Sequence, residues 1–426
     1  KCQAQLARSH PHRRDLMNIL FAVHQFFPKF YTGTEQVVLN LARQMQKIGH
    51  RATVLTYEFE DKEDIIPKGD LLVRNYLYQG LEVKSIRYSS HPEDLDFLIN
   101  RADMEKELAD LLDEMDCHLV HVCHPMRVGS VIRAARSKGI PVIMTLTDFW
   151  LICPKFVAVT AKNMLCHGPE AGSKCAKECY DDRWAQRLKG RFREIAQTVE
   201  EVDCIISPTK FLGDTIEREL HIKTRIIPFG QEYGDFMPNP RSYSKDSMIT
   251  VGFLSTLVPH KGAHILIDAF NRLDTNNMQL RIYGDHLGNK DYFESLKNMV
   301  VVPDKVLFCG RYKEADLPAI LQEVDVVAVP SLWWENSPLV LLRALAHRVP
   351  SIVSNMGGMT ELVEDGVNGF TFESGDPESL AIILKRISSD PTILNGIKRD
   401  ILLPPRIEEE AFEYEKLYLE VARKGL

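Results

Sequence analysis

Residues 325–346 read DVVAVPSLWWENSPLVLLRALA, and this stretch sets the pattern that predicts the fold. It begins as a short apolar strand, passes through a polar loop and ends in an apolar helical pattern. Repeated strand–helix units of this kind build a parallel sheet. Ser337 is predicted as the N-cap of the helix and Pro338 as its first residue. The backbone N–H groups of Leu339 and Val340 then point out of the helix start, where a diphosphate can bind.

The same alternation continues on both sides of this stretch. The apolar runs are NILFAVH (18–24), RATVLT (51–56), HLVHV (118–122), IPVIMTL (140–146), CIISP (204–208), MITVGFL (248–254), LRIYG (280–284), KVLFCG (305–310) and PSIVS (350–354). Between the fifth and sixth runs, QEYGDFMPNPRSYSKDS has the composition of a linker. We therefore predict an α/β protein of two doubly wound, Rossmann-like domains facing a cleft. The domains are expected at 17–228 and 246–390, residues 391–426 as a helical segment that packs back on the first domain, and residues 1–16 as an extension.

Length and composition restrict the class of protein further. The chain has 426 residues, 45% of them hydrophobic and 26% charged, which suits two globular cores. A net charge of -7 argues against nucleic acid as a partner. Neither a membrane-spanning run nor a signal peptide is predicted, so a cytoplasmic location is expected. No G-x-G-x-x-G turn follows a strand, which weakens a dinucleotide-binding interpretation.

Further candidate residues lie in loops at the carboxyl ends of predicted strands, where ligands of open α/β sheets bind. Gly33 allows a ligand to approach the backbone closely, and Thr34 is the predicted cap of the helix that follows. The ammonium of Lys261 can neutralise a phosphate. Glu335 lies just before the predicted anion site. A structural glycine turn, a solvated lysine and a surface glutamate are the respective alternatives.

Two more loops complete the predicted site. Gly357 and Gly358 allow a close approach, and Glu361 is expected to start the next helix. Gly310, Arg311 and Tyr312 offer backbone groups and a flat surface to a nucleobase.

The order and spacing of these segments resemble glycosyltransferase family 4, whose members are retaining enzymes of the GT-B fold. The resemblance covers residues 17–390 and is densest from 249 to 372. It implies a UDP- or GDP-sugar donor held mainly by the second domain and a glycan or lipid-linked acceptor held by the first. It also implies catalysis without a metal cofactor and a role in polysaccharide or glycoconjugate assembly.

The resemblance assigns roles to individual residues. Glu335 and Lys261 are the implied catalytic residues, and His124 and Asp148 lie on the acceptor side. The implied donor-binding residues are Gly33, Thr34, Thr256, Gly310, Arg311, Tyr312, Asn336, Ser337, Pro338, Leu339, Val340 and Arg343.

Three positions depart from the family pattern. Arg343 replaces a glutamate that usually binds ribose, Thr256 replaces an arginine, and Thr147 replaces a histidine. We predict that Arg343 reaches the diphosphate that Thr256 cannot neutralise; the alternative is that Arg343 points to solvent or pairs with a neighbouring acid. The departures also leave two other functions open, a catalytically silent relative that binds a nucleotide sugar or a partner enzyme, and a glycogen- or sucrose-type synthase.

An insertion at about 150–182 carries four clustered cysteines, Cys153, Cys166, Cys175 and Cys179. Four thiols can hold a structural zinc ion tetrahedrally, or an iron–sulfur cluster. Two disulfides or four unlinked thiols are the alternatives, because the spacing matches no paired C-x-x-C pattern. The five single cysteines are expected to be buried thiols: Cys2, Cys117, Cys123, Cys204 and Cys309.

A basic amphipathic helix is predicted after the insertion, in DRWAQRLKGRFREIAQTVEEVD (182–203). Its predicted apolar face consists of Trp184, Leu188, Phe192, Ile195 and Val199, and its basic residues are Arg183, Arg187, Lys189, Arg191 and Arg193. Such a helix can make a peripheral contact with an anionic membrane. The alternative is a helix that packs on its own domain with a solvated basic face.

Overall fold

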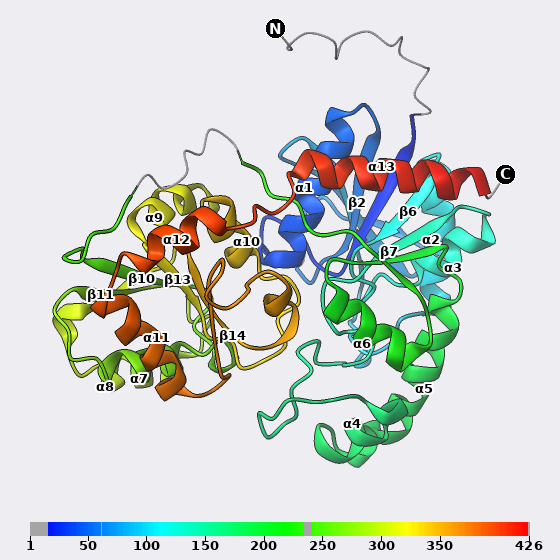
Figure 1. Ribbon diagram of the computed structural model, residues 1–426. Coiled ribbons are helices and arrows are strands. Elements are labelled where there is room, and N and C mark those ends of the chain that lie inside the picture. The colour runs from blue at the N-terminus through cyan, green and yellow to red at the C-terminus, as the bar shows by residue number, and fades with distance from the viewer. Residues whose placement is uncertain (1–15, 61, 234–240, 425–426) are drawn as a thin grey trace, which may run out of the picture.

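A computed structural model describes residues 16–60, 62–233 and 241–424. Figure 1 shows two α/β domains side by side, the first in blue to green and the second in yellow to orange. Apart from Leu16, the predicted N-terminal extension lies outside the described residues, and so does the middle of the predicted linker.

The first domain is built on a 9-stranded sheet with the order β3-β4-β5-β2-β1-β6-β7-β8-β9. Its strands are β1 Asn18–Val23, β2 Arg51–Tyr57, β3 Ile66–Lys68, β4 Leu71–Tyr78, β5 Leu81–Tyr88, β6 Leu119–Val122, β7 Val142–Thr145, β8 Cys204–Ser207 and β9 Thr224–Ile226. Strand β4 pairs antiparallel with β3 and β5, whereas the other strand pairs are parallel. The sequence analysis did not predict the strands of this antiparallel edge, β3, β4 and β5.

Helices cover both faces of this sheet: α1 Gly33–Lys47, α2 Ala102–Glu114, α3 Val131–Ser137, α5 Asp182–Val199 and α6 Lys210–Leu220. Helix α4, Ser173–Glu178, belongs to the insertion and packs against α5. Strand β1 shows why both faces must be covered, because its alternate side chains enter different cores. Leu20 and Ala22 pack in the core that includes α2, α3 and α5. Phe21 and Val23 pack in the core beneath α1.

The second domain is built on a 6-stranded parallel sheet with the order β12-β11-β10-β13-β14-β15. Its strands are β10 Ile249–Leu254, β11 Met278–Tyr283, β12 Val306–Gly310, β13 Val326–Val329, β14 Ser351–Ser354 and β15 Phe370–Phe372. Its helices are α7 Ala263–Asn271, α8 Lys290–Met299, α9 Leu317–Glu323, α10 Leu339–Ala346, α11 Pro377–Ser389 and α12 Ile393–Asp400, with short 3-10 turns that include η2 Pro259–Lys261 and η5 Gly357–Glu361. The prediction of two doubly wound domains is confirmed.

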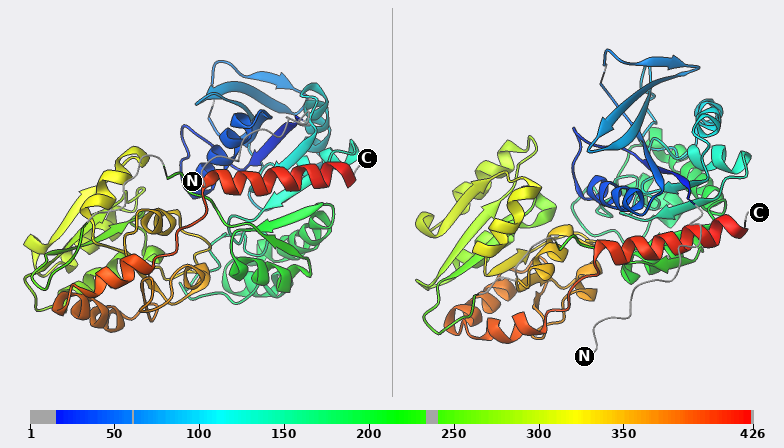
Figure 2. Two further views of the ribbon diagram at one scale, coloured as in Figure 1. Left: turned by 45° about the horizontal axis from the view of Figure 1, so that its top comes forward. Right: turned by 90° about the horizontal axis from the view of Figure 1, so that it is seen from above.

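The C-terminal segment divides between the two domains. Helix α12 packs into the second domain through Leu394 and Ile397, so the prediction that all of 391–426 returns to the first domain is wrong. Helix α13, Ile407–Lys424, does return, and Figure 2 shows it running along the first domain. The buried hydroxyls of Tyr418 and Tyr414 lie 2.7 Å from His121 Nδ1 and 2.8 Å from Thr145 Oγ1. These polar contacts fix the helix against β6 and β7.

Candidate functional site

The loop after β13 buries a carboxylate. Glu335 is 5% exposed, and its Oε1 accepts hydrogen bonds from Lys261 Nζ at 2.6 Å, Ser331 Oγ at 2.7 Å and Trp333 Nε1 at 2.7 Å. Burial by itself raises the pKa of Glu335, but the Lys261 ammonium and the two neutral donors outweigh it, so this pKa lies below its ordinary value. Glu335 is therefore ionised at neutral pH, with Lys261 as its counter-charge.

Lys261 is positioned by a close contact between two loops. It ends the turn η2, and Gly262 follows with a φ of 76°. A Cβ at Gly262 would lie 1.8 Å from the carbonyl oxygen of Pro330. Only glycine fits there, and the loops after β10 and β13 consequently meet backbone to backbone. The Lys261 ammonium also lies 4.7 Å from the centre of the Trp333 ring.

Helix α10 begins at Leu339 with its start uncapped. Pro338 is the N-cap residue and has extended backbone, so the prediction of Ser337 as N-cap and Pro338 as first helical residue is wrong by one position. The first helical hydrogen bonds run from Leu341 N and Leu342 N to Pro338 O. The N–H groups of Leu339 and Val340 remain available to an anion, as predicted.

Helix α1 of the first domain begins opposite α10. A Cβ on Gly33 would lie 3.9 Å from Leu339 Cδ1, which is van der Waals contact. Thr32, not Thr34, is the N-cap, and its backbone N–H donates to Glu35 Oε2 at 2.8 Å in a capping box. The spacing Thr32-x-x-Glu35 carried this signal in the sequence. The start of α1 thus lies against Leu339 at the start of α10, four residues after Glu335, and each helix start favours a negative charge.

The side chain of Asn336 forms hydrogen bonds between the two domains. Its Oδ1 accepts from Thr209 Oγ1 at 2.8 Å, and its Nδ2 donates to Thr147 O at 3.2 Å. Thr209 and Thr147 belong to the first domain. The Asn336 side chain therefore links the two domains, and its implied contact with the donor stays a prediction.

The glycine pair after β14 supports the same loop. Gly358 N donates to Glu335 O at 2.8 Å, and a Cβ on Gly358 would lie 1.8 Å from Asn336 O. Glu361 ends η5 rather than starting a helix, which corrects the prediction. Its carboxylate accepts from Lys210 N at 2.9 Å and Phe211 N at 2.5 Å, and so caps helix α6 of the first domain.

Arg343 does not replace the missing charge at Thr256. Its Nη2 lies 2.6 Å from Glu314 Oε1, so the structure favours the alternative of a pair with a neighbouring acid. The physical reason is proximity: η4, Glu314–Asp316, brings a carboxylate next to α10. Thr256 lies half-buried in the loop after β10.

The predicted nucleobase loop contacts the first domain. The Arg311 guanidinium lies 4.5 Å from the centre of the Tyr31 ring, just before α1. Tyr312 is half-buried with its ring 6.3 Å from that of Tyr283, and burial raises its pKa to about 12. Gly310 ends β12.

The first domain contributes a buried cluster of polar groups. His124 Nε2 lies 3.0 Å from Asp148 Oδ2, which brings the two predicted acceptor-side residues together. The ring of His24, which the sequence analysis missed, lies 4.0 Å from that of His124. Burial, His124 and Arg127 hold the pKa of His24 well below its usual range. His24 Nδ1 and Glu35 Oε1 are buried without a hydrogen-bond partner.

The four clustered cysteines line one pocket. Among the residues that the structure describes, however, no three His, Cys, Asp or Glu side chains are placed to hold a metal ion as they stand. The zinc site therefore stays a prediction. Of the single cysteines, Cys117 and Cys123 are buried as expected, Cys204 is half-buried, Cys309 is exposed and Cys2 lies outside the described residues.

The basic helix is α5, and it packs on its own domain. Its predicted apolar face is confirmed, with Leu188, Phe192, Ile195 and Val199 buried and Trp184 stacked on Phe97. Arg191 faces inward and is 1% exposed, so its place on the basic face is wrong. Within the described ranges, no helix combines the length and the apolar character needed to span a membrane.

Two family models match the chain. One, described as Glycosyltransferase Family 4, matches residues 31–230, and the other, described as Glycosyl transferases group 1, matches residues 239–400. An uncharacterised glycosyltransferase of Methanocaldococcus jannaschii is 25% identical over 90% of this chain and 93% of its own length. A UDP-Gal:alpha-D-GlcNAc-diphosphoundecaprenol alpha-1,3-galactosyltransferase of Escherichia coli is 40% identical over 41% of this chain and 49% of its own length. The chain thus spans about half of that second relative.

Solved structures show the same fold. Sucrose-phosphate synthase from Thermosynechococcus elongatus superposes with a TM-score of 0.70 at 17% identity, over 96% of this chain and 100% of that one. Anabaena HepE in complex with UDP superposes with a TM-score of 0.67 at 18% identity, over 95% and 100% of the two chains.

Proposed function

This chain belongs to glycosyltransferase family 4, with the GT-B fold, and on that premise we propose that it transfers a sugar from a UDP- or GDP-sugar to a glycan or lipid-linked acceptor with retention. One observation carries the proposal: the start of α1 lies against the start of α10, and the loop that leads into α10 carries the buried Lys261–Glu335 pair. Such a place suits a diphosphate. The UDP bound to Anabaena HepE, and the lipid-linked substrate in the name of the Escherichia coli relative, support the proposed donor and acceptor classes.

In this proposal, the second domain stabilises the leaving diphosphate without a metal ion. The Lys261 ammonium and the free N–H groups of Leu339 and Val340 face the charge that develops as the glycosidic phosphate bond breaks. Glu335 holds Lys261 through Oε1, and the three donors described for this carboxylate all bind that oxygen. The other oxygen, Oε2, accepts a hydrogen bond from a hydroxyl group of the donor sugar.

The first domain holds the acceptor in this proposal. His124 and Asp148 form a polar pair, and the neighbouring His24 Nδ1 and Glu35 Oε1 are buried without partners. Unpaired buried polar atoms are costly, and an acceptor hydroxyl that bound them would remove that cost. The departing phosphate takes the acceptor proton, so the step needs no protein base.

The proposal is tested with UDP, GDP and ADP sugars. A bound donor at 100 times its dissociation constant raises stability by about 2.7 kcal/mol, which thermal unfolding detects. Release of nucleoside diphosphate that depends on a glycan or lipid-linked acceptor, with the anomeric configuration retained in the product, supports the proposal. Binding without release identifies a silent relative and contradicts the proposal. Preference for an ADP-sugar donor or for a sugar-phosphate acceptor identifies a synthase of the glycogen or sucrose type, and it contradicts the proposed donor or acceptor class.

A further inference from the structure

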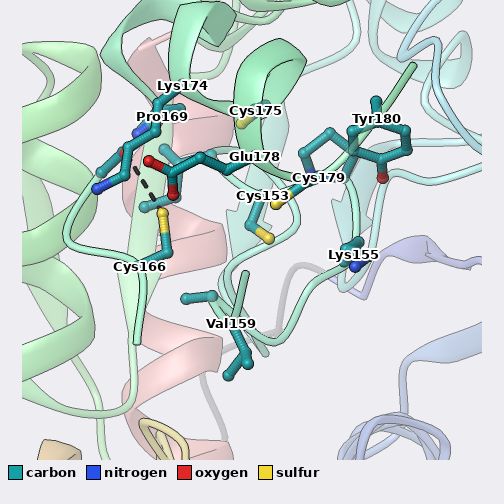
Figure 3. Close-up of a pocket in the computed structure, with 14 residues that line it drawn as sticks. Cys153, Lys155, Val159, Cys166, Pro169, Lys174, Cys175, Glu178, Cys179 and Tyr180 are labelled. Carbon is teal, nitrogen blue, oxygen red and sulfur yellow. Dashed lines mark hydrogen bonds between the residues drawn. The ribbon is translucent and has the colours of Figure 1, made fainter. Parts of the chain in front are cut away.

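The four thiols of the insertion come from two parts of one segment and converge on one pocket. Cys153 and Cys166 lie on its irregular part, whereas Cys175 lies on α4 and Cys179 directly follows it. The spacing of four residues places Cys175 and Cys179 on the same side of a helical turn. In Figure 3 the four sulfur atoms surround a common space. Cys175 is buried, and the other three are half-buried.

A buried positive charge lies beside these thiols without a carboxylate partner. The guanidinium of Arg191 is enclosed by protein, and its described hydrogen bonds go to three backbone carbonyls, those of Phe97, Leu151 and Trp150. Two of these carbonyls, those of Trp150 and Leu151, lie just before Cys153 in the chain, so the guanidinium is held next to the start of the cysteine segment. A buried charge is normally compensated by an opposite charge, which a centre of four metal-bound thiolates provides.

The other charged side chains around the pocket also carry more positive than negative charge. Lys155, Lys174 and Glu178 also line it. Together with Arg191 they leave an excess of two positive charges. A divalent ion bound by four thiolates carries a formal charge of about −2, which balances that excess.

The backbone of the segment is also strained without a visible cause. Its left-handed residues other than glycine are Phe156, Ala158, Asn163, Glu170 and Ala171, with φ between 49° and 59°. Apart from asparagine, these residue types rarely adopt that conformation. From 153 to 172 the segment has no helix or strand longer than the 3-10 turn η1, Glu170–Gly172. Such strain persists where surrounding bonds enforce it, and a metal centre provides bonds of that kind.

From these observations we propose that Cys153, Cys166, Cys175 and Cys179 bind one zinc ion, which holds the segment folded. Zinc prefers four sulfur ligands in a tetrahedron at about 2.3 Å, and a site closed by four protein ligands is structural rather than catalytic. The thiols lie farther apart than these distances require, so binding of the ion draws them together and releases their protons.

The zinc site would support the loop after β13 through one contact. His167 follows the ligand Cys166, and its ring lies 5.3 Å from that of Trp334. Trp334 directly precedes Glu335. The ion therefore holds in place a part of the first domain that packs against the loop carrying the buried carboxylate.

Metal content of the full-length chain, purified without chelators, tests the proposal. We expect about one zinc per chain in the wild type, and at most about a fifth of that in Cys175→Ser and Cys179→Ser. Cys309→Ser is the matched control, because Cys309 is an exposed thiol in the second domain, and it should retain the full amount. Wild-type protein without zinc, iron in place of zinc, or equal zinc in the Cys175→Ser and Cys309→Ser variants would overturn the proposal.

A second measurement avoids variants that fail to fold. Cobalt(II) exchanged into the wild-type chain should give the intense visible bands and the sulfur-to-metal charge-transfer band of a tetrahedral thiolate site. A thiol-specific mercurial should then release the metal from the native protein. A weak octahedral cobalt spectrum, or four cysteines recovered as two disulfides by mass spectrometry under non-reducing conditions, would contradict a metal site.

Discussion

The two domains share an architecture, but they differ in whether their buried carboxylates are paired with a lysine or an arginine. In the second domain, Glu335 pairs with Lys261 at 2.6 Å and Asp325 pairs with Arg241 at 2.9 Å. In the first, Glu35 and Glu410 accept backbone or hydroxyl hydrogen bonds, and the described part of the chain gives neither a lysine or arginine partner. A buried charge needs a counter-charge to stay ionised.

The pKa values follow this difference. Burial raises the pKa of Glu410 to about 8 and raises that of Glu35. The pKa of Glu335 is lowered in spite of its burial, because Lys261 is next to it. The second domain thus holds an ion pair beside the proposed diphosphate site, whereas burial in the first domain raises the pKa of Glu35 and Glu410, which have no such counter-charge.

Removing the paired carboxylate should have the largest effect. Glu335→Ala is expected to lower turnover on the order of a hundredfold or more, because Lys261 loses the group that orients it. Because the substitution also breaks a buried ion pair, thermal unfolding of the variant checks that the fold persists at the assay temperature. Steady-state rates measure the effect, with the exposed Glu294→Ala on α8 as the control. An unchanged rate in an active enzyme would remove Glu335 from the site.

The unpaired carboxyl of Glu410 should make stability depend on pH. Its folded pKa of about 8 lies above the ordinary 4.5, so the stability it contributes is present below about pH 4.5 and is lost as the pH rises to 8. Glu410→Gln cannot ionise. The variant should therefore gain about 2 kcal/mol or more over the wild type between pH 5 and pH 9, as measured by denaturant unfolding. Parallel pH profiles for the two proteins would show that Glu410 has a counter-charge after all.

The smallest effect is expected at Glu35. Glutamine also closes a capping box, and burial raises the pKa of Glu35 and so disfavours its charged form. Glu35→Gln should therefore change the free energy of unfolding at pH 7 by less than about 1 kcal/mol. A loss of several kcal/mol, comparable to breaking a buried ion pair, would place a charged carboxylate in the first domain and remove the contrast between the domains.

The sequence predicted what depends on repeated patterns. Alternating strands and helices predicted the two domains. The loop positions identified Lys261 and Glu335, the family resemblance implied His124 and Asp148, and the structure brings each of these two sets together as a pair. The β4–β5 hairpin was not predicted. Its two strands are joined by the two-residue turn Gln79-Gly80, a length typical of hairpins.

Side-chain partners were harder to predict than the loops that carry them. Asn336 lies in the loop after β13 and Arg343 on α10, as the local pattern predicted. Their partners come from distant segments: Thr209 donates a hydrogen bond to Asn336, and Glu314 forms an ion pair with Arg343. Such choices depend on tertiary contacts that no local spacing encodes.

In our proposal, a diphosphate binds at Lys261 and the starts of α1 and α10. Calorimetric affinities for UDP and GDP, compared with those for uridine and guanosine, test it in the wild type and in Lys261→Met. The exposed Lys290→Met on α8 is the control. We expect Lys261→Met to weaken binding of the better diphosphate by about 1–3 kcal/mol, or about 5- to 150-fold, and to leave the corresponding nucleoside unaffected. Equal losses for diphosphate and nucleoside, or no loss at all, would contradict the account.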